Sequence, residues 1–142
     1  MSIAEMIADH PQVKEEDPAL GQAVRHAMYC AAICNSCADA CSAEEADMRQ
    51  CIRSCSDCSD ICTATYRTAS RRTAGNVLLI MGMFELCIQA CEQCAEECEK
   101  HDDPHCKRCA KMCRETIEDC RKALEFMKKE QLEQLIMQKT LT

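Results

Sequence analysis

The sequence predicts an all-α protein, an up-down-up-down four-helix bundle with a short extra helix at its N-terminus. Three observations support this fold class. Helix-start signals recur along the chain, Gly and Pro number only three each and mark the breaks, and no segment shows the period-two alternation typical of strands. A chain of 142 residues has the length of one domain. We assign residues 1–17 to a short helix with a linker and residues 18–142 to the bundle.

The first element is predicted from a capping box. Ser2 is followed three positions later by Glu5, a pair that satisfies the free amide groups at a helix start. This helix is expected to end near Pro11. We expect either its apolar side chains or a neighbouring subunit to cover the apolar surface near the end of the last helix. The side chains concerned are Ile3, Met6 and Ile7.

Two long helices are predicted next. An Asp-Pro pair at positions 17–18 places an N-cap side chain before a proline at the first helical position, which predicts a helix over 18–41. Ser42 with Glu45 has the spacing of another capping box and predicts a helix over 42–72.

Two further helices complete the bundle. The segment 73–76 reads Thr-Ala-Gly-Asn and indicates a break, after which a helix is predicted over 76–100. Asp103 and Pro104 repeat the Asp-Pro start signal and predict the last helix over 104–137. Short turns between four long helices are typical of antiparallel bundles.

Each long helix carries the cysteine pattern CxxxCxxCxxxC or a close variant of it. The first three sets are Cys30, Cys34, Cys37 and Cys41; Cys51, Cys55, Cys58 and Cys62; and Cys87, Cys91, Cys94 and Cys98. The last helix has Cys106, Cys109, Cys113 and Cys120, with Thr116 in the remaining position of the repeat.

This spacing places the four cysteines of a unit on one face. With about 3.6 residues per turn, offsets of 4, 7 and 11 residues form a stripe about 60° wide. Such positions are the heptad seam along which bundle helices face one another. We therefore expect the thiols to point inward and to line the bundle core.

Clustered thiols can form disulfides or bind metal ions, and the redox state of the cellular compartment decides between these two possibilities. A disulfide framework needs an oxidising compartment, but the start MSIAEMIADHPQVKEEDP has neither the basic nor the apolar segment of a secretory signal. We therefore expect a cytoplasmic chain with metal-binding thiols. Two structural interpretations compete with metal binding: cysteine as a small apolar core residue, and a disulfide ladder, which thiols at i and i+4 could form only with strain.

The arrangement of the thiols favours Cu(I). Thiolates select Cu(I), zinc or iron-sulfur clusters. Structural zinc takes closed sets of four ligands, and iron-sulfur clusters also take four thiolates each. A continuous ladder that presents thiols two at a time suits an ion of low coordination number, and a monovalent ion adds about one positive charge per thiolate. We expect about one Cu(I) ion per cysteine; an iron-sulfur electron carrier and a zinc or general metal buffer remain the alternatives.

The two ends of the predicted bundle differ. At the end where the first long helix begins, the positions that continue the cysteine lattice are mostly apolar and predict a closed plug. At the opposite end these positions include Met48, His101 and Cys106, with His105 beside them. Because these side chains are soft or borderline ligands, we expect them to bind copper where it enters the bundle.

Composition argues against several other functions. A formal net charge of −7 disfavours nucleic acid, because phosphate binding needs a basic face. The sequence shows no run of about 18 apolar residues, so we expect no membrane span. It also lacks a glycine-rich phosphate loop and a recognisable nucleophile-base arrangement, so we expect a binding protein rather than an enzyme.

The cysteine units, together with the string CEKHDDPHCKRCAKMC from Cys98 to Cys113, resemble the cytosolic, signal-less branch of the bacterial copper storage proteins. The resemblance covers about residues 18–128. It implies storage of many Cu(I) ions inside the bundle, held mostly by pairs of Cys thiolates, and assembly into a homotetramer. It also implies a role for His101 and His105 near the open end. Thr116 departs from the pattern: about one or two ions are either missing at its level or held by Cys113 and Cys120 with partners on other helices.

Overall fold

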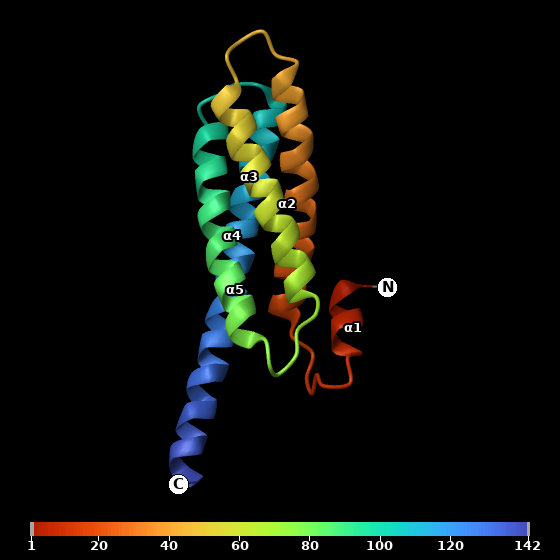
Figure 1. The fold of residues 1–142 in the computed structure, drawn as a ribbon, viewed down its shortest axis with the longest axis vertical. Coiled ribbons are helices and arrows are strands. Elements are labelled where there is room, and N and C mark those ends of the chain that lie inside the picture. Colours follow the sequence, from red (N-terminus) through yellow and green to blue (C-terminus); the bar gives the residue numbers. More distant parts are fainter. Residues whose placement is uncertain (1, 142) are drawn as a thin grey trace.

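The computed structural model describes residues 2–141, within which the chain forms five α-helices and no strands. The helices are α1 (Ile3–Ala8), α2 (Pro18–Ser42), α3 (Arg49–Ala69), α4 (Val77–Cys98) and α5 (Pro104–Leu141). Helices α2 to α5 run alternately up and down as a four-helix bundle, and α1 lies on its outside (Figure 1). The predicted fold class is confirmed.

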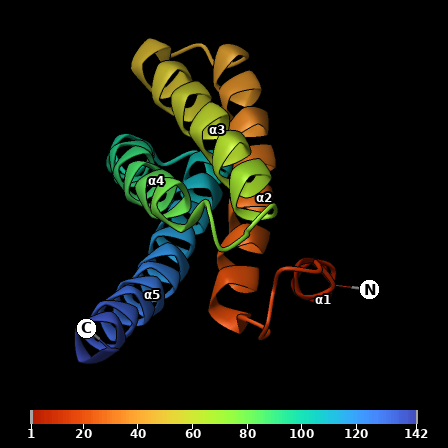
Figure 2. The ribbon, with the colours of Figure 1, turned by 60° about the horizontal axis from the view of Figure 1, so that its bottom comes forward.

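The bundle helices pack in cyclic order. Helix α2 contacts α3 and α5, and α4 contacts the same two helices. In the tilted view of Figure 2, α2 lies beside α3 and α4 beside α5. Each helix therefore turns one face toward a common core, which is where the cysteine stripes meet.

The predicted starts of three helices agree with the structure. The Oγ of Ser2 accepts a hydrogen bond from the Glu5 amide at 3.1 Å, and Oδ1 of Asp17 accepts one from the Leu20 amide at 3.0 Å. Each bond satisfies an amide that has no partner within the helix. Helix α5 begins at Pro104, as the second Asp-Pro pair predicts.

The capping box predicted at Ser42 and Glu45 is wrong. Ser42 is the last residue of α2, a turn occupies residues 43–48, and α3 begins at Arg49. Two antiparallel helices need connecting residues to reverse the chain, and a helix starting at position 42 would leave none. Instead, Oδ1 of Asp47 accepts the amide hydrogen of Arg49 at 3.1 Å.

Four other predicted boundaries shift by a few residues. Helix α3 ends at Ala69, α4 spans 77–98, and α5 continues to Leu141. The α3–α4 turn is held partly by Asn76, whose Oδ1 accepts the backbone amide of Thr73 at 2.7 Å. Local side-chain contacts of this kind decide where a helix frays.

The end of the bundle where α2 begins is closed by an apolar plug, as predicted. Phe84 and Met127 are among its largest members, and both are fully buried. The plug positions, all buried except the partly buried Val77, are Leu20, Ala23, Ala27, Thr65, Ala69, Val77, Ile80, Phe84, Ala123 and Met127. This end therefore offers no open path to the core.

The last part of α5 projects beyond the plug (Figure 1). It exposes Leu132, Leu135, Ile136, Met137 and Leu141, each at more than half of its accessible surface. The predicted cover by the N-terminal helix is wrong, because α1 packs on α2 through its buried and partly buried isoleucines. A neighbouring subunit remains the predicted cover.

Helix α4 is unusually apolar. Its most apolar window has a mean hydropathy of 1.4, which by length and composition alone would suit a membrane crossing. The sequence-based expectation that no segment is long and apolar enough to span a membrane therefore does not hold for α4 by this criterion. Core helices of soluble bundles meet the same criterion, and α4 turns its cysteine stripe toward the other three helices.

Candidate metal centre

The sixteen cysteines line the bundle core. All are free thiols, and the most accessible, Cys37, is 3% exposed. Heptad spacing places them there, because the stripe of each helix is the face that packs against its neighbours. The structure thus has a sulfur-lined interior between the apolar plug and the opposite end, where the α2–α3 and α4–α5 turns meet (Figure 1).

Thiols one turn apart on a helix lie close together. The Sγ–Sγ distance is 3.7 Å between Cys30 and Cys34 and 3.9 Å between Cys58 and Cys62. An α-helix places residues i and i+4 on the same face, one above the other. Each stripe therefore presents its sulfur atoms in adjacent pairs.

Thiols on different helices lie equally close. Sγ of Cys58 is 3.6 Å from Sγ of Cys91, and Sγ of Cys55 is 3.6 Å from Sγ of Cys98. These contacts join α3 to α4 across the core. A sulfur atom in the middle of the bundle therefore has partners on its own helix and on its neighbours.

The thiols group into quartets that share members. In each quartet the four ligand atoms lie within 4.8 Å of one another. The quartets are Cys30, Cys34, Cys58 and Cys113; Cys30, Cys58, Cys62 and Cys91; Cys34, Cys94, Cys109 and Cys113; and Cys37, Cys55, Cys98 and Cys109. Five of the eleven cysteines in these four quartets belong to two of them, so a thiolate at such a position can bridge two ions.

Sharing distinguishes this core from an array of separate zinc sites. A structural zinc site is a closed set of four ligands, with each thiolate given to one ion. Here Cys34 and Cys113 belong to the same two quartets, so filling both with separate four-coordinate ions would require bridging. Soft thiolate ladders with bridging sulfur suit Cu(I).

Contacts between thiols alter their acidity. Hydrogen bonding, first with Cys113 and then with Cys34, lowers the pKa of Cys109 to about 6. Burial is the main cause that raises the pKa of Cys41 and of Cys106. A metal-free core therefore contains ionised and protonated thiols side by side, and a binding cation replaces the protons of the latter.

The end of the core opposite the plug, where copper is expected to enter and which we call the open end, contains a mixed quartet. Nδ1 of His105 lies 3.4 Å from Sγ of Cys37, 3.6 Å from Sγ of Cys106 and 4.0 Å from Sγ of Cys41. The four ligand atoms form a group within 4.8 Å. Hydrogen bonding with Cys37, and then with Glu44, raises the pKa of His105. The structure thus brings His105 to the thiols, although the sequence favours His101.

The other two residues predicted at this end lie differently. Met48 is 4% exposed and is part of the buried core cluster. Nε2 of His101 lies 3.5 Å from a carboxylate oxygen of Glu97, one turn earlier in the chain. The contact with Glu97 turns His101 toward an acidic side chain.

Glu44 is a functional candidate that sequence reasoning missed. Its Oε1 lies 2.9 Å from Nε2 of His105. Residues 42–45 match the local pattern of a helix start, so the sequence predicts a helix at Glu44 instead of a turn. The acidic residues following Cys41 were the available clue.

Thr116 occupies its predicted place in the cysteine lattice. It is fully buried, and its hydroxyl donates a hydrogen bond to the backbone oxygen of Met112 at 2.8 Å, with the backbone oxygen of His26 as a longer, alternative acceptor at 3.4 Å. The pKa of Cys120, one turn further, is raised by its interaction with the Cys87 thiol first and by burial second. Thr116 therefore interrupts the sulfur stripe of α5.

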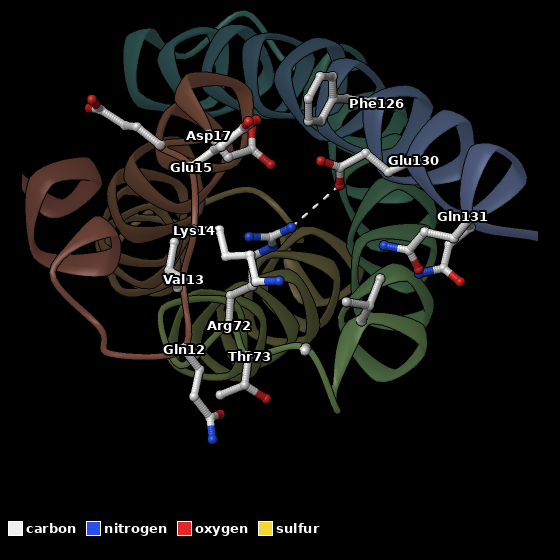
Figure 3. Close-up of a pocket in the computed structure, with 14 residues that line it drawn as sticks. Gln12, Val13, Lys14, Glu15, Asp17, Arg72, Thr73, Phe126, Glu130 and Gln131 are labelled. Carbon is white, nitrogen blue, oxygen red and sulfur yellow. Dashed lines mark hydrogen bonds and ion pairs between the residues drawn. The ribbon is translucent and has the colours of Figure 1, made fainter. Parts of the chain in front are cut away.

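A pocket at the closed end is chemically unrelated to the sulfur core. Figure 3 shows Arg72 pointing toward Glu130 of α5. Nη2 of Arg72 lies 3.3 Å from Oε2 of Glu130, and the surrounding cavity has a volume of about 330 Å³. The lining residues are Gln12, Val13, Lys14, Glu15, Glu16, Asp17, Arg72, Thr73, Ala74, Val77, Phe126, Glu130, Gln131 and Gln134. They include no thiol, so this pocket joins the linker, the α3–α4 turn and α5 without extending the metal centre.

Comparison with known protein families decides the assignment. The sequence profile of the copper storage proteins matches residues 16–125. The chain belongs to the copper storage protein family. The match includes every cysteine, from Cys30 to Cys120, and leaves out α1 and the projecting end of α5.

Solved structures of copper storage proteins share the fold. The Streptomyces lividans copper storage protein Ccsp loaded with 10 copper equivalents has 30% identity and a TM-score of 0.80, with 87% of this chain and 98% of that chain covered. The cytosolic S. lividans protein with five coppers has 35% identity and a TM-score of 0.72, covering 75% and 92%. A histidine-to-alanine variant of Ccsp has 34% identity and a TM-score of 0.74, covering 77% and 94%. A search among curated proteins found no match.

Proposed function

We propose that this copper storage protein holds many Cu(I) ions in the cytosol, bound by the cysteine thiolates of the bundle core. The observation that carries the proposal is the sharing of buried free thiols between neighbouring quartets. Sharing allows the ions to follow one another along the core. The structural relatives, one of them described as cytosolic, support the proposal because they were solved with five and ten copper equivalents.

Charge supports a monovalent cargo. An isolated charge in a dry interior is unfavourable, so the net charge of the filled core must stay small. A Cu(I) ion with one deprotonated thiol is neutral, whereas a divalent ion held by four thiolates leaves two negative charges per site. Repeating such a site along the core would accumulate buried negative charge.

A Cu(I) titration against a competing chelator, under anaerobic and reducing conditions, tests the proposal. We expect saturation at about one equivalent per cysteine. Saturation below about six equivalents would overturn the storage function. Visible absorbance with acid-labile sulfide in the purified protein would indicate an iron-sulfur carrier instead, and about four tetrahedral divalent ions per chain would indicate a zinc buffer.

Copper is proposed to enter at the open end. Met48, His101, His105 and Cys106 lie at or near this end, and the plug closes the other. Ions then move inward by exchange between adjacent thiolates, each step forming one Cu–S bond as another breaks. Sγ–Sγ distances of 3.6 to 4.0 Å between neighbouring thiols support this route, because an ion can contact the next sulfur atom before it leaves the last. Storage requires binding and release only, so no catalytic residue is assigned.

A homo-oligomer, in particular a homotetramer, is proposed to cover the exposed end of α5. The five apolar side chains there lie outside the region that matches the family profile. Light scattering after size-exclusion chromatography measures the mass, for which we expect four chains. Replacing Leu135 and Ile136 together by lysine should lower that mass, whereas Gln131→Lys serves as a control on the same segment. A mass of one chain for the unaltered protein would contradict the proposal.

A further inference from the structure

The two ring nitrogens of His105 have different neighbours. Nδ1 faces the sulfur atoms, 3.4 Å from Cys37 and 3.6 Å from Cys106. Nε2 faces the opposite way and lies 2.9 Å from Oε1 of Glu44. The imidazole ring therefore sits between the thiol quartet of the open end and one carboxylate.

This arrangement selects one tautomer of the ring. A neutral imidazole carries one N–H and one lone pair, and a carboxylate can only accept a hydrogen bond. A short contact between Nε2 and Glu44 therefore places the hydrogen on Nε2. The lone pair is then on Nδ1, the atom that faces the sulfur quartet. Metal-binding histidines are commonly oriented by a carboxylate on the other ring nitrogen.

The position of Glu44 is itself well defined. The backbone amide of Ala43 donates to the carbonyl of Ala40 at 3.1 Å, and that of Glu44 donates to the carbonyl of Cys41 at 3.2 Å. These bonds tie the start of the α2–α3 turn to the last turn of α2. Because the same turn of helix presents Cys41 to the core, the backbone of Glu44 and this thiol belong to one hydrogen-bonded segment.

We propose that Glu44 is a positioning residue for copper uptake. Glu44 keeps His105 in the Nε2–H tautomer and turns Nδ1 toward the thiols of Cys37, Cys41 and Cys106. A mixed nitrogen-sulfur site is thereby formed at the open end before copper binds. This rests on the proposed function, in which His105 takes part in copper binding. The hydrogen bond also joins the α2–α3 turn to the first turn of α5 across the open end.

The test uses three variants of the full chain. Glu44→Ala removes the acceptor, Glu44→Gln keeps an amide oxygen that can accept the same hydrogen, and Glu45→Ala is a matched control in the same exposed turn. Long-range ¹⁵N–¹H NMR of the metal-free proteins, at a pH where the ring is neutral, reports the tautomer of His105. Stopped-flow measurements with Cu(I) report the loading rate, and a chelator titration reports affinity for the first equivalents and total capacity.

We expect the Nε2–H tautomer in the unaltered protein, in Glu44→Gln and in Glu45→Ala, and a mixture of tautomers in Glu44→Ala. Removal of a supporting residue of this kind typically weakens metal affinity by about 10- to 100-fold, so Glu44→Ala should weaken binding of the first equivalents by a factor in this range while capacity stays unchanged. In a His105→Ala background, Glu44→Ala should have no further effect on loading.

Two results would overturn the inference. One is an unchanged tautomer in Glu44→Ala, and the other is an equal loss of affinity from Glu44→Ala with and without His105. The tautomer is read without metal, so it tests the role of Glu44 even if the storage proposal fails. A low copper capacity of the unaltered protein would count against storage alone.

Discussion

The hydroxyl of Thr116 donates a hydrogen bond to the carbonyl oxygen of Met112, 2.8 Å away and one turn earlier in α5. The hydroxyl therefore turns back to its own helix. Thr116 is fully buried at a level of the core where the cysteine repeat would place a thiol. A neutral hydroxyl is a poor ligand for a soft monovalent ion, so the sulfur ladder of α5 has a gap between Cys113 and Cys120.

Filling this gap should increase copper binding. In Thr116→Cys the side chain changes little in size, and a thiol joins the stripe between Cys113 and Cys120. We expect the capacity in a Cu(I) titration to rise by about one equivalent. Thr116→Ser, which keeps a hydroxyl, should leave the capacity unchanged. An equal capacity in all three folded proteins would show that the level of Thr116 binds no copper even with sulfur present.

The two helical glycines, Gly21 and Gly82, have different surroundings and should respond differently to replacement by alanine. A Cβ on Gly21 would lie 2.5 Å from Cβ of Ala4 in α1, whereas a Cβ on Gly82 would meet nothing within 4 Å. Gly82→Ala should stabilise the metal-free protein by about 1 kcal/mol through helix propensity. Gly21→Ala should instead displace α1.

Thermal unfolding under reducing conditions and limited proteolysis check this pair. For Gly21→Ala we expect little or no gain in Tm and faster tryptic cleavage at Lys14 in the linker. Copper capacity should stay the same, because α1 contacts α2 on the outside of the bundle. Equal stabilisation by both substitutions would mean that α1 does not pack closely at Gly21.

The two histidines of the open end should contribute unequally to loading. His105→Ala removes the nitrogen that faces the thiol quartet, whereas His101→Ala removes a side chain in contact with Glu97. Stopped-flow loading should therefore slow more in His105→Ala than in His101→Ala, with similar final capacities. The sequence alone suggests the reverse order, so a larger effect of His101 would favour that interpretation over the geometry.

Copper uptake should weaken as the pH falls. Burial raises the pKa of Cys41 and of Cys106, so both thiols are protonated at neutral pH and each must release a proton to bind Cu(I). The pKa of Cys109 is lowered to about 6 by hydrogen bonding with Cys113, so this thiol is already ionised at pH 7. Lower pH favours the protonated thiols, which compete with the metal.

The number of protons released on copper binding should reflect these raised and lowered pKa values. At neutral pH we expect clearly less than one proton released per cysteine engaged, because hydrogen bonding with neighbouring thiols lowers the pKa of Cys109 and also of five other thiols. These five are Cys30, Cys37, Cys58, Cys87 and Cys94. Below the pKa of Cys109 the release should increase by about one proton, and affinity should fall by about tenfold per pH unit for each proton displaced. A pH indicator dye during copper addition measures the release. A count that does not change with pH would contradict the assignment for Cys109.

Most of the fold could be predicted because its signals are local. The Asp17 and Asp103 start signals, and the heptad spacing of the cysteines, depend only on helix geometry within a few residues. The turn at 43–48 could not be predicted in the same way. Ser42 and Glu45 satisfy the local pattern of a helix start, but the need to reverse the chain between antiparallel helices overrides it.

The candidate site, too, has one part that local helix geometry predicts and another part that depends on tertiary packing. The sequence by itself determined that α2 to α5 each present one sulfur stripe, because side-chain direction in a helix follows from position. Only the tertiary structure decided which groups meet at the open end. Glu44 and His105 stand 61 positions apart, and nothing local relates them. Their contact arises because antiparallel packing brings the end of α2 beside the start of α5, where the carboxylate reaches the ring across the turn.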